Sequence, residues 1–223
     1  MTVKSKYKSI PEWIAIGENT LRADDEAIDE GNPWQLLPAI RAKLESKFAV
    51  FSEAATKADL SGRNYTKRVK EKRRLSKMGR EAIMKLKVYI ENAFLDDAKW
   101  LNHNLLLDKS YPTDDQEIGG HLASVCSAIN SHDDAAYPLP ASFTDPIYDI
   151  REKFRQALLD VTDYLEDRRT AVQERNKALL EFKKVLAPIR KWLYQMLPEG
   201  RYDTRLLGYG FNPYKRKRKR KMD

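Results

Sequence analysis

The chain has 223 residues, of which 33 % are charged, and it carries a formal net charge of +8. This charged share exceeds the roughly one quarter of an average soluble domain and favours long helices with wide solvated faces over a sheet protein. One cysteine, Cys126, excludes an internal disulfide, no stretch approaches the roughly 20 apolar residues of a membrane span, and Met1 to Pro11 lacks the apolar core of a secretory signal. We expect a protein of the cytoplasm, or of the nucleus in a eukaryote, without a membrane partner.

The positive charge is concentrated in two segments. Residues 215–221 contribute +7, and residues 63–87, which hold eleven Lys and Arg against two Glu, contribute +9, so the rest of the chain carries −8. Segregation of this kind favours oriented binding to a polyanion, or head-to-tail association between copies of the chain.

The first quarter of the chain predicts two helices. Residues 11–29 place Pro11 in a first helical turn and continue with a broken apolar face, and Gly31-Asn32-Pro33 forms a turn. A second helix follows over residues 34–58, where apolar side chains recur at steps of three and four. We expect Ser61-Gly62 to reverse the chain, so that the next helix lies antiparallel.

The middle of the chain predicts one long helix and one short one. The long helix runs from about Asn64 to Leu107, with Gly79 as its only weak position. Prolines and glycines then mark turns between residues 108 and 145. A short helix fits from about His121 to Asn130.

The longest apolar pattern runs from Ile147 to Met196 and is typical of a coiled-coil seam. Pro188 interrupts the backbone hydrogen bonding but not the phase of the pattern, so we expect a kink there rather than an end. Arg168 and Arg175 fall on the seam, where an arginine needs an acid, water or an opening in the bundle. One column reads Leu158, Leu165, Val172, Leu179, Leu186 and Leu193, and the other reads Val161, Arg168, Arg175, Phe182, Ile189 and Met196.

Together these elements predict an all-α fold. We expect an elongated four- to five-helix bundle with two long helices of about 45–50 residues, a coiled-coil-like seam and a disordered basic C-terminal tail. Residues 1–207 form a single bundle domain, and residues 208–223 form an aromatic and glycine-containing anchor followed by the tail. The two long helices are expected to run antiparallel, with a parallel arrangement as the alternative.

The basic tail is the first candidate site. Consecutive cations repel one another and have no apolar partner, so the segment is expected to contact a polyanion such as DNA or RNA. A nuclear import signal and a merely solubilising end are the alternatives. The residues are Lys215, Arg216, Lys217, Arg218, Lys219, Arg220 and Lys221.

A second basic patch lies in the long middle helix, where its side chains wrap most of the circumference. It is interpreted as a solvated helix, as a nucleic-acid face, or as a dock for the acidic residues 24–30 of a neighbouring copy. The aromatic residues of 206–214 either stack on bases or, as we prefer, seal the end of the bundle. The patch consists of Lys67, Arg68, Lys70, Lys72, Arg73, Arg74, Lys77 and Arg80.

Signs of catalysis and of metal binding are lacking in the sequence. The spacing of His103, His121, His132 and Cys126 matches no common set of metal ligands. The chain has no di-iron Glu-x-x-His motif, no Gly-rich phosphate loop and no nucleophile elbow. We therefore expect no enzyme, no cofactor and no metal.

The expected function is that of a non-enzymatic structural, scaffolding or interaction protein. Its helical surface engages other copies of the chain or a helical partner, and its basic arm contacts a polyanion. The alternative is a dedicated, sequence-nonspecific nucleic-acid-binding protein that uses residues 63–87 together with the tail. A bundle enzyme or ligand carrier is the second alternative.

Overall fold

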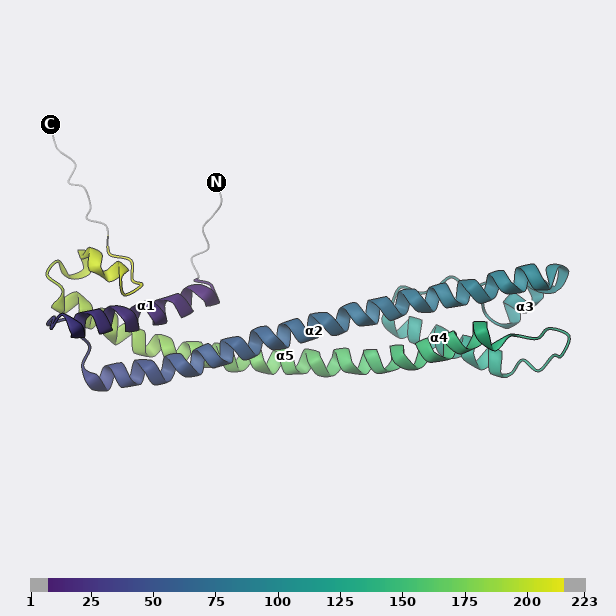
Figure 1. Cartoon of the computed structure of the whole chain (residues 1–223), viewed down its shortest axis with the longest axis horizontal. Helices are drawn as coiled ribbons and strands as arrows, with labels where there is room; N and C mark the ends of the chain where they lie inside the picture. Colours follow the sequence, from purple (N-terminus) through teal and green to yellow (C-terminus); the bar gives the residue numbers. More distant parts are fainter. Residues whose placement is uncertain (1–7, 215–223) are drawn as a thin grey trace, which may run out of the picture. The chain divides into compact units, whose positions relative to one another are not determined.

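The chain folds into helices alone over the residues that the structure describes. The computed structural model describes residues 8–214, and in this range it contains five α-helices, three short 3-10 helices and no strand (Figure 1). The predicted all-α class is confirmed, and so are two long helices, each of 56 residues. The helices are α1 (Ile10–Asp29), α2 (Pro38–Ala93), α3 (Ala98–Asn104), α4 (Asp115–Asn130) and α5 (Ala141–Met196).

The chain divides into two compact units. The first unit combines Met1–Leu60 with Arg169–Asp223, and the second consists of Ser61–Arg168. Helix α2 therefore contributes residues 38–60 to the first unit and 61–93 to the second, and α5 is shared between the units in the same way.

Helix α1 starts one residue before the predicted position. The Ser9 side chain accepts a hydrogen bond from the Glu12 backbone N–H, and the Glu12 carboxylate bonds back to the Ser9 backbone, which makes a capping box ahead of Pro11. This cap provides partners for backbone groups that a helix start leaves free.

The predicted reversal at Ser61-Gly62 is wrong, because α2 continues through both residues. A Cβ atom added at Gly62 would meet nothing within 4 Å, so this glycine is required neither for a turn nor for a close contact. A glycine inside a helix costs about 1 kcal/mol relative to alanine. The burial of apolar residues on both sides of it, such as Ala58 and Leu75, offsets that cost.

The predicted end of the middle helix at Leu107 is also wrong. Helix α2 ends at Ala93, and Leu95 has a φ of +34°, which no α-helix can accommodate. A 3-10 helix (Leu95–Asp97) and α3 follow, and they bring Leu101 and Leu105 into the core of the second unit. Burial of these two side chains is why the apolar spacing resembled a continued helix.

Helices α4 and α5 both begin earlier than predicted. The Asp114 side chain accepts hydrogen bonds from the Gln116 and Glu117 backbone N–H groups and caps α4, which begins at Asp115, six residues before His121. Helix α5 begins at Ala141 and includes Pro146. It also continues through Pro188, as expected.

In the first unit α2 and α5 run antiparallel, and α1 packs with them (Figure 1). Phe51 and Phe182 are fully buried at the centre of this core. Farther along α2, Lys57 pairs with Glu174 at 2.7 Å, so residue numbers rise along one helix as they fall along the other. The C-terminal segment also packs here, through buried Leu206, Tyr209 and Phe211.

In the second unit α2 and α5 are antiparallel as well, and α4 packs against them. The Tyr89 ring stacks on Phe143 with centroids 4.7 Å apart, and Arg68 pairs with Asp160 at 3.2 Å. Gly79 allows the approach of the loop before α4, because a Cβ atom there would lie 2.8 Å from the Tyr111 hydroxyl oxygen. That hydroxyl donates a hydrogen bond to the Ser76 carbonyl at 3.0 Å.

The two seam arginines find different surroundings. Arg168 is exposed, and its guanidinium lies 5.3 Å from the centroid of the Tyr65 ring, a cation–π contact within the second unit. Arg175, in the first unit, is half-buried and donates to the Asn176 side chain at 3.0 Å. Neither arginine is enclosed in the core.

Asp203 fastens the segment that follows α5 in the first unit. Its buried carboxylate accepts from the Arg205 side chain at 2.8 Å and from the backbone N–H groups of Arg205 and Glu199 at 2.9 and 3.3 Å. These hydrogen bonds, above all that of the Arg205 side chain, lower the pKa of Asp203 to about 2.

We expect Asp203→Asn to reduce the free energy of unfolding by about 2 kcal/mol at pH 6. Because the folded-state pKa is depressed, this contribution is present above the ordinary pKa of 3.8 and is lost as the pH falls toward 2. About half of the difference should remain at pH 3. Urea unfolding at the two pH values measures it.

The control is Glu181→Gln, which removes an exposed carboxylate paired with Lys184 in the same unit. Its expected effect is a few tenths of a kcal/mol at either pH. A loss for Asp203→Asn that does not change between pH 6 and pH 3 would contradict the linkage.

Candidate polyanion-binding face

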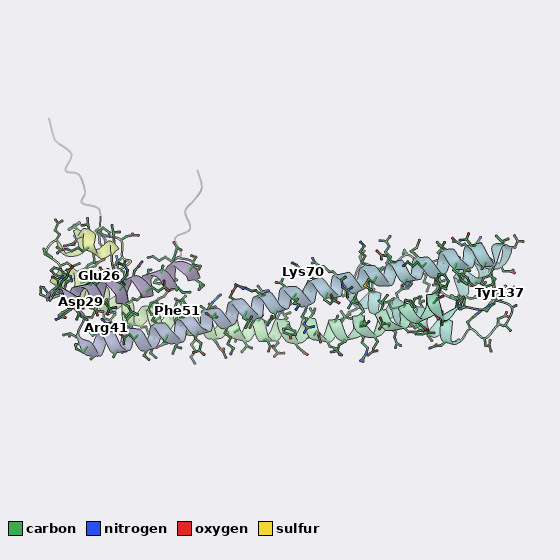
Figure 2. All side chains as sticks on the ribbon, in the orientation of Figure 1. Glu26, Asp29, Arg41, Phe51, Lys70 and Tyr137 are labelled. Atoms are coloured by element: carbon green, nitrogen blue, oxygen red, sulfur yellow. The ribbon has the colours of Figure 1, made fainter. Side chains whose placement is uncertain are left out.

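Four cations form a stripe on the outer side of α2 in the second unit. Lys67, Lys70, Arg73 and Arg80 are exposed, and no residue between 8 and 214 forms an ion pair with any of them. At 100° per residue they fall within about 140° of the circumference, centred away from core positions such as Leu75. Figure 2 shows Lys70 on the side of α2 that faces away from α5.

The stripe extends over a useful length. From Lys67 to Arg80 the helix rises about 20 Å at 1.5 Å per residue. Four unmatched positive charges over this distance form a linear array, the arrangement that follows a phosphate backbone. We call Lys67, Lys70, Arg73 and Arg80 the basic stripe.

The other four members of the predicted basic patch have acidic partners in the second unit. Lys72, which is largely buried, pairs with Asp115 at the start of α4, and Arg68 pairs with Asp160 on α5. A hydrogen bond with the Tyr164 hydroxyl and the nearby Asp160 carboxylate raise the pKa of Arg68 above its ordinary value. These two cations fasten α4 and α5 to α2 within the unit.

Arg74 and Lys77 are matched within α2 itself. Arg74 donates to both carboxylate oxygens of Glu71, at 2.9 and 2.7 Å, and Lys77 lies 3.7 Å from Glu81. Such exposed pairs at i, i+3 and i, i+4 are typical of a solvated helix. The predicted patch is therefore divided into a matched half and the unmatched basic stripe.

The first candidate site, the basic tail of Lys215 to Lys221, lies outside the described residues 8–214. Of the aromatic residues that precede them, Tyr209 and Phe211 are buried, so these two rings are not accessible to bases. Tyr214 is exposed and contacts Tyr194 edge to face, at a centroid distance of 6.1 Å.

The histidines and the cysteine do not assemble into a site. His103 lies 3.1 Å from Asp108, and the Nε2 atom of His132 lies 2.8 Å from the Tyr137 carbonyl oxygen. His121 packs against Tyr111, and burial lowers its pKa. Cys126 is buried, and burial raises the pKa of its thiol. From residue 8 to residue 214, no group of His, Cys, Asp and Glu could hold a metal ion.

Sequence reasoning missed the exposed apolar side chains that continue beyond the basic stripe. Met84 and Val88 are 50 % and 47 % exposed, one helical turn apart on α2. Their side chains line a hollow of about 490 Å³ together with Tyr89, Asn92 and Phe143. The one available signal was the spacing of Met84 and Val88, which continues the outer line of Lys77 and Arg80.

Comparison of the chain with known protein families, curated proteins and solved structures gives no match. In the part of the chain from Lys8 to Tyr214, no helix has the length and apolarity that crossing a membrane requires.

Proposed function

We propose that this protein is a non-enzymatic helical interaction protein that holds a polyanion, most simply nucleic acid, against the basic stripe of α2. The observation that carries this proposal is the absence of ion-pair partners for the four exposed cations within residues 8–214. The other four cations of the predicted patch all have acidic partners, so the stripe is the part of that patch whose charge remains available to a ligand.

The distribution of charge supports the same proposal. Residues 8–214 hold equal numbers of acidic and basic side chains, so the whole net charge of +8 comes from the two terminal segments. A neutral body would attract a polyanion only through local charge separation, which the basic stripe provides. The segment 215–221 would add a second contact, with phosphate-directed and sequence-independent binding.

The scaffolding function expected from the sequence is compatible with this binding. A cytoplasmic location, or a nuclear one in a eukaryote, belongs to the same proposal, because nucleic acid must be accessible. In this view the helices present the cations, and the bound polymer brings copies of the protein together.

Neutralising the basic stripe should weaken binding to random-sequence DNA and reduce its salt dependence. Changing Lys67, Lys70, Arg73 and Arg80 to Gln together is expected to lower the log–log salt slope by about 3 to 4, at roughly 0.9 per phosphate contact. Fluorescence anisotropy at several salt concentrations measures both quantities. Deleting residues 215–223, alone and in combination, separates the contribution of the tail.

The matched control removes the same charge from cations that already have partners. In this control variant, four exposed cations that form i, i+3 or i, i+4 ion pairs are changed to Gln. The log–log salt slope of DNA binding should remain nearly unchanged. A control that weakens binding as much as the stripe variant would rule out the stripe as the binding face. The control residues are Arg22, Lys153, Arg155 and Lys184.

A further inference from the structure

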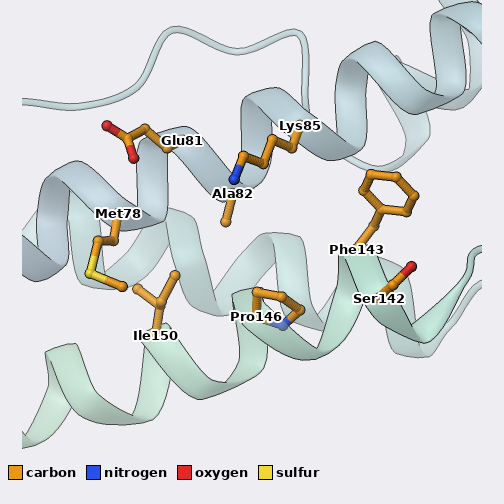
Figure 3. A pocket seen from close by; sticks show the side chains of 8 residues that line it. All are labelled: Met78, Glu81, Ala82, Lys85, Ser142, Phe143, Pro146 and Ile150. Carbon is orange, nitrogen blue, oxygen red and sulfur yellow. The ribbon is translucent and has the colours of Figure 1, made fainter.

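Two neighbouring hollows lie along α2 and α5 in the second unit. The first has a volume of about 230 Å³ and apolar walls that include Met78, Ala82, Pro146 and Ile150 (Figure 3). The second, of about 490 Å³, is the one beside Met84 and Val88. Lys85 and Phe143 line both hollows and therefore form the ridge between them.

The hollows open on a side of the α2–α5 pair that α4 does not cover. Helix α4 approaches α2 at Gly79, where an added Cβ atom would lie 3.2 Å from Leu122. Lys85 projects about 120° around the helix from Gly79, since successive residues are 100° apart. The apolar walls, with half-exposed Met84 and Val88 beside them, thus lack a third helix within residues 8–214.

The charges around this groove favour an acidic occupant. Lys85 lines both hollows, is exposed and has no ion-pair partner within residues 8–214. Glu81, which lines the first hollow, is already matched by Lys77 at 3.7 Å, and Glu91 is matched by Lys87 at 4.0 Å. The same face of a second copy would bring Lys85 close to the Lys85 of its partner, which is unfavourable.

The spacing of the hollows favours a helix. Their centres fall near residues 82 and 88 of α2, about 9 Å apart along the axis at 1.5 Å per residue. Side chains at positions i and i+7 of a helix laid along α2 are separated by about 10 Å, so each would enter one hollow. A small residue at i+3 or i+4 of that helix would pass over the ridge of Lys85 and Phe143.

We propose that this groove binds an acidic amphipathic α-helix of a partner protein. Its apolar face would cover Met84 and Val88, and a glutamate or aspartate at its edge would pair with Lys85. This inference does not depend on the polyanion function, because no residue of the basic stripe lines either hollow.

The test uses the purified full-length chain and a fluorescein-labelled synthetic helix of about 18 residues, with Leu at steps of three and four and Glu elsewhere. Fluorescence anisotropy should show saturable binding. Val88→Asp and Lys85→Glu should each raise the dissociation constant about tenfold or more. Both positions are exposed, so the helical circular-dichroism signal should remain unchanged.

Leu159→Asp is the matched control, because Leu159 is a 50 % exposed leucine on α5 that lines neither hollow. It should leave the dissociation constant unchanged. Absence of saturable binding would overturn the proposal, and so would equal losses for Leu159→Asp and Val88→Asp. Equally tight binding of a peptide with Lys in place of Glu would do the same.

Two further outcomes would assign the groove to another occupant and overturn the proposal. The first is binding to phosphatidylglycerol vesicles that Val88→Asp abolishes, without binding to the peptide. The second is a concentration-dependent doubling of mass in light scattering that Val88→Asp abolishes, which would mean that a second copy covers the face. DNA binding by Val88→Asp should equal that of the unmodified chain. Disproof of the groove proposal would therefore not count against DNA binding by the basic stripe.

Discussion

Replacing Asp24 with Asn is expected to lower the free energy of unfolding of the first unit by about 3 kcal/mol, because it leaves a largely buried guanidinium opposite a neutral amide. The Asp24 side chain is fully buried, and one carboxylate oxygen lies 3.0 Å from the Arg41 guanidinium. Asp24→Ala should cost more, since it also removes the acceptor for a backbone N–H.

Asp24 also connects neighbouring elements of the first unit through its hydrogen bonds. Its second oxygen accepts a hydrogen bond from the Leu36 backbone N–H at 2.6 Å. A single carboxylate therefore joins α1, the turn after it and the first turns of α2. Leu36 is itself buried, so its N–H would have no water partner if the carboxylate were removed.

Urea unfolding followed by tryptophan fluorescence measures the loss, because three of the four tryptophans, Trp13, Trp34 and Trp192, belong to the first unit. Asp25→Asn is the matched control. Asp25 pairs with the same Arg41 at 2.5 Å, but its side chain is 59 % exposed, so a few tenths of a kcal/mol are expected. Equal losses for the two variants would show that burial of Asp24 contributes nothing.

The helices whose signals are local were predictable from the sequence. Helix α1 has a Ser-Ile-Pro-Glu start with its cap, and α5 has apolar residues at steps of three and four over most of its length. Pro188 did not end α5 because its fixed φ suits a helix and the apolar phase continues to Ile189 and Leu193, which are fully buried. Periodicity that leads to burial on both sides of a proline outweighs the lost hydrogen bond.

The helix boundaries were predicted wrongly where tertiary packing outweighed the local sequence signal. Ser61-Gly62 has the composition of a turn, yet the helix passes through it, because α2 buries residues with its partner helix before and after the glycine. Leu101 and Leu105 have helical spacing, yet the chain breaks at Leu95 and brings them back into the core. No pattern within the segment distinguishes these two outcomes.

The candidate site was predictable in position but not in composition. Eight basic residues of α2 could be identified from the sequence, and two of their ion pairs lie within the helix, whereas the matching of Lys72 and Arg68 depends on Asp115 and Asp160. Those acids come from α4 and α5, far along the chain, and their register against α2 follows from packing. The hollows beside Met84 and Phe143 depend on the same register.

Phe182→Ala is expected to lower the free energy of unfolding of the first unit by about 4 kcal/mol, the typical cost of truncating a fully buried phenylalanine. Phe182 has no exposed surface, and its ring stacks on Phe51 at a centroid distance of 5.4 Å and an angle of 12°. It also contacts Phe48 at 5.5 Å. The cavity would open where α5 meets α2.

The effect should extend to α1 through Phe48. A Cβ atom added at Gly17 would lie 2.3 Å from the Phe48 ring, so α1 rests directly on that ring. Removing the Phe182 ring takes away the support behind Phe48 and allows it to shift from Gly17. We therefore expect α1 to lose protection from amide hydrogen exchange in Phe182→Ala, in addition to the global loss of stability.

Two controls distinguish this cavity from a general sensitivity of α5. Leu180→Ala truncates a side chain of the same helix that is 59 % exposed, and it should change the free energy of unfolding by less than about 0.5 kcal/mol. Phe182→Leu retains most of the buried volume and should cost less than about half as much as Phe182→Ala. Because Phe182 and Phe51 stack, the double variant with Phe51→Leu should deviate from additivity by about 0.5–1.5 kcal/mol. If Phe182→Ala and Leu180→Ala unfold at the same urea concentration, the three rings do not form the centre of the first unit, and the antiparallel register of α2 and α5 there is wrong.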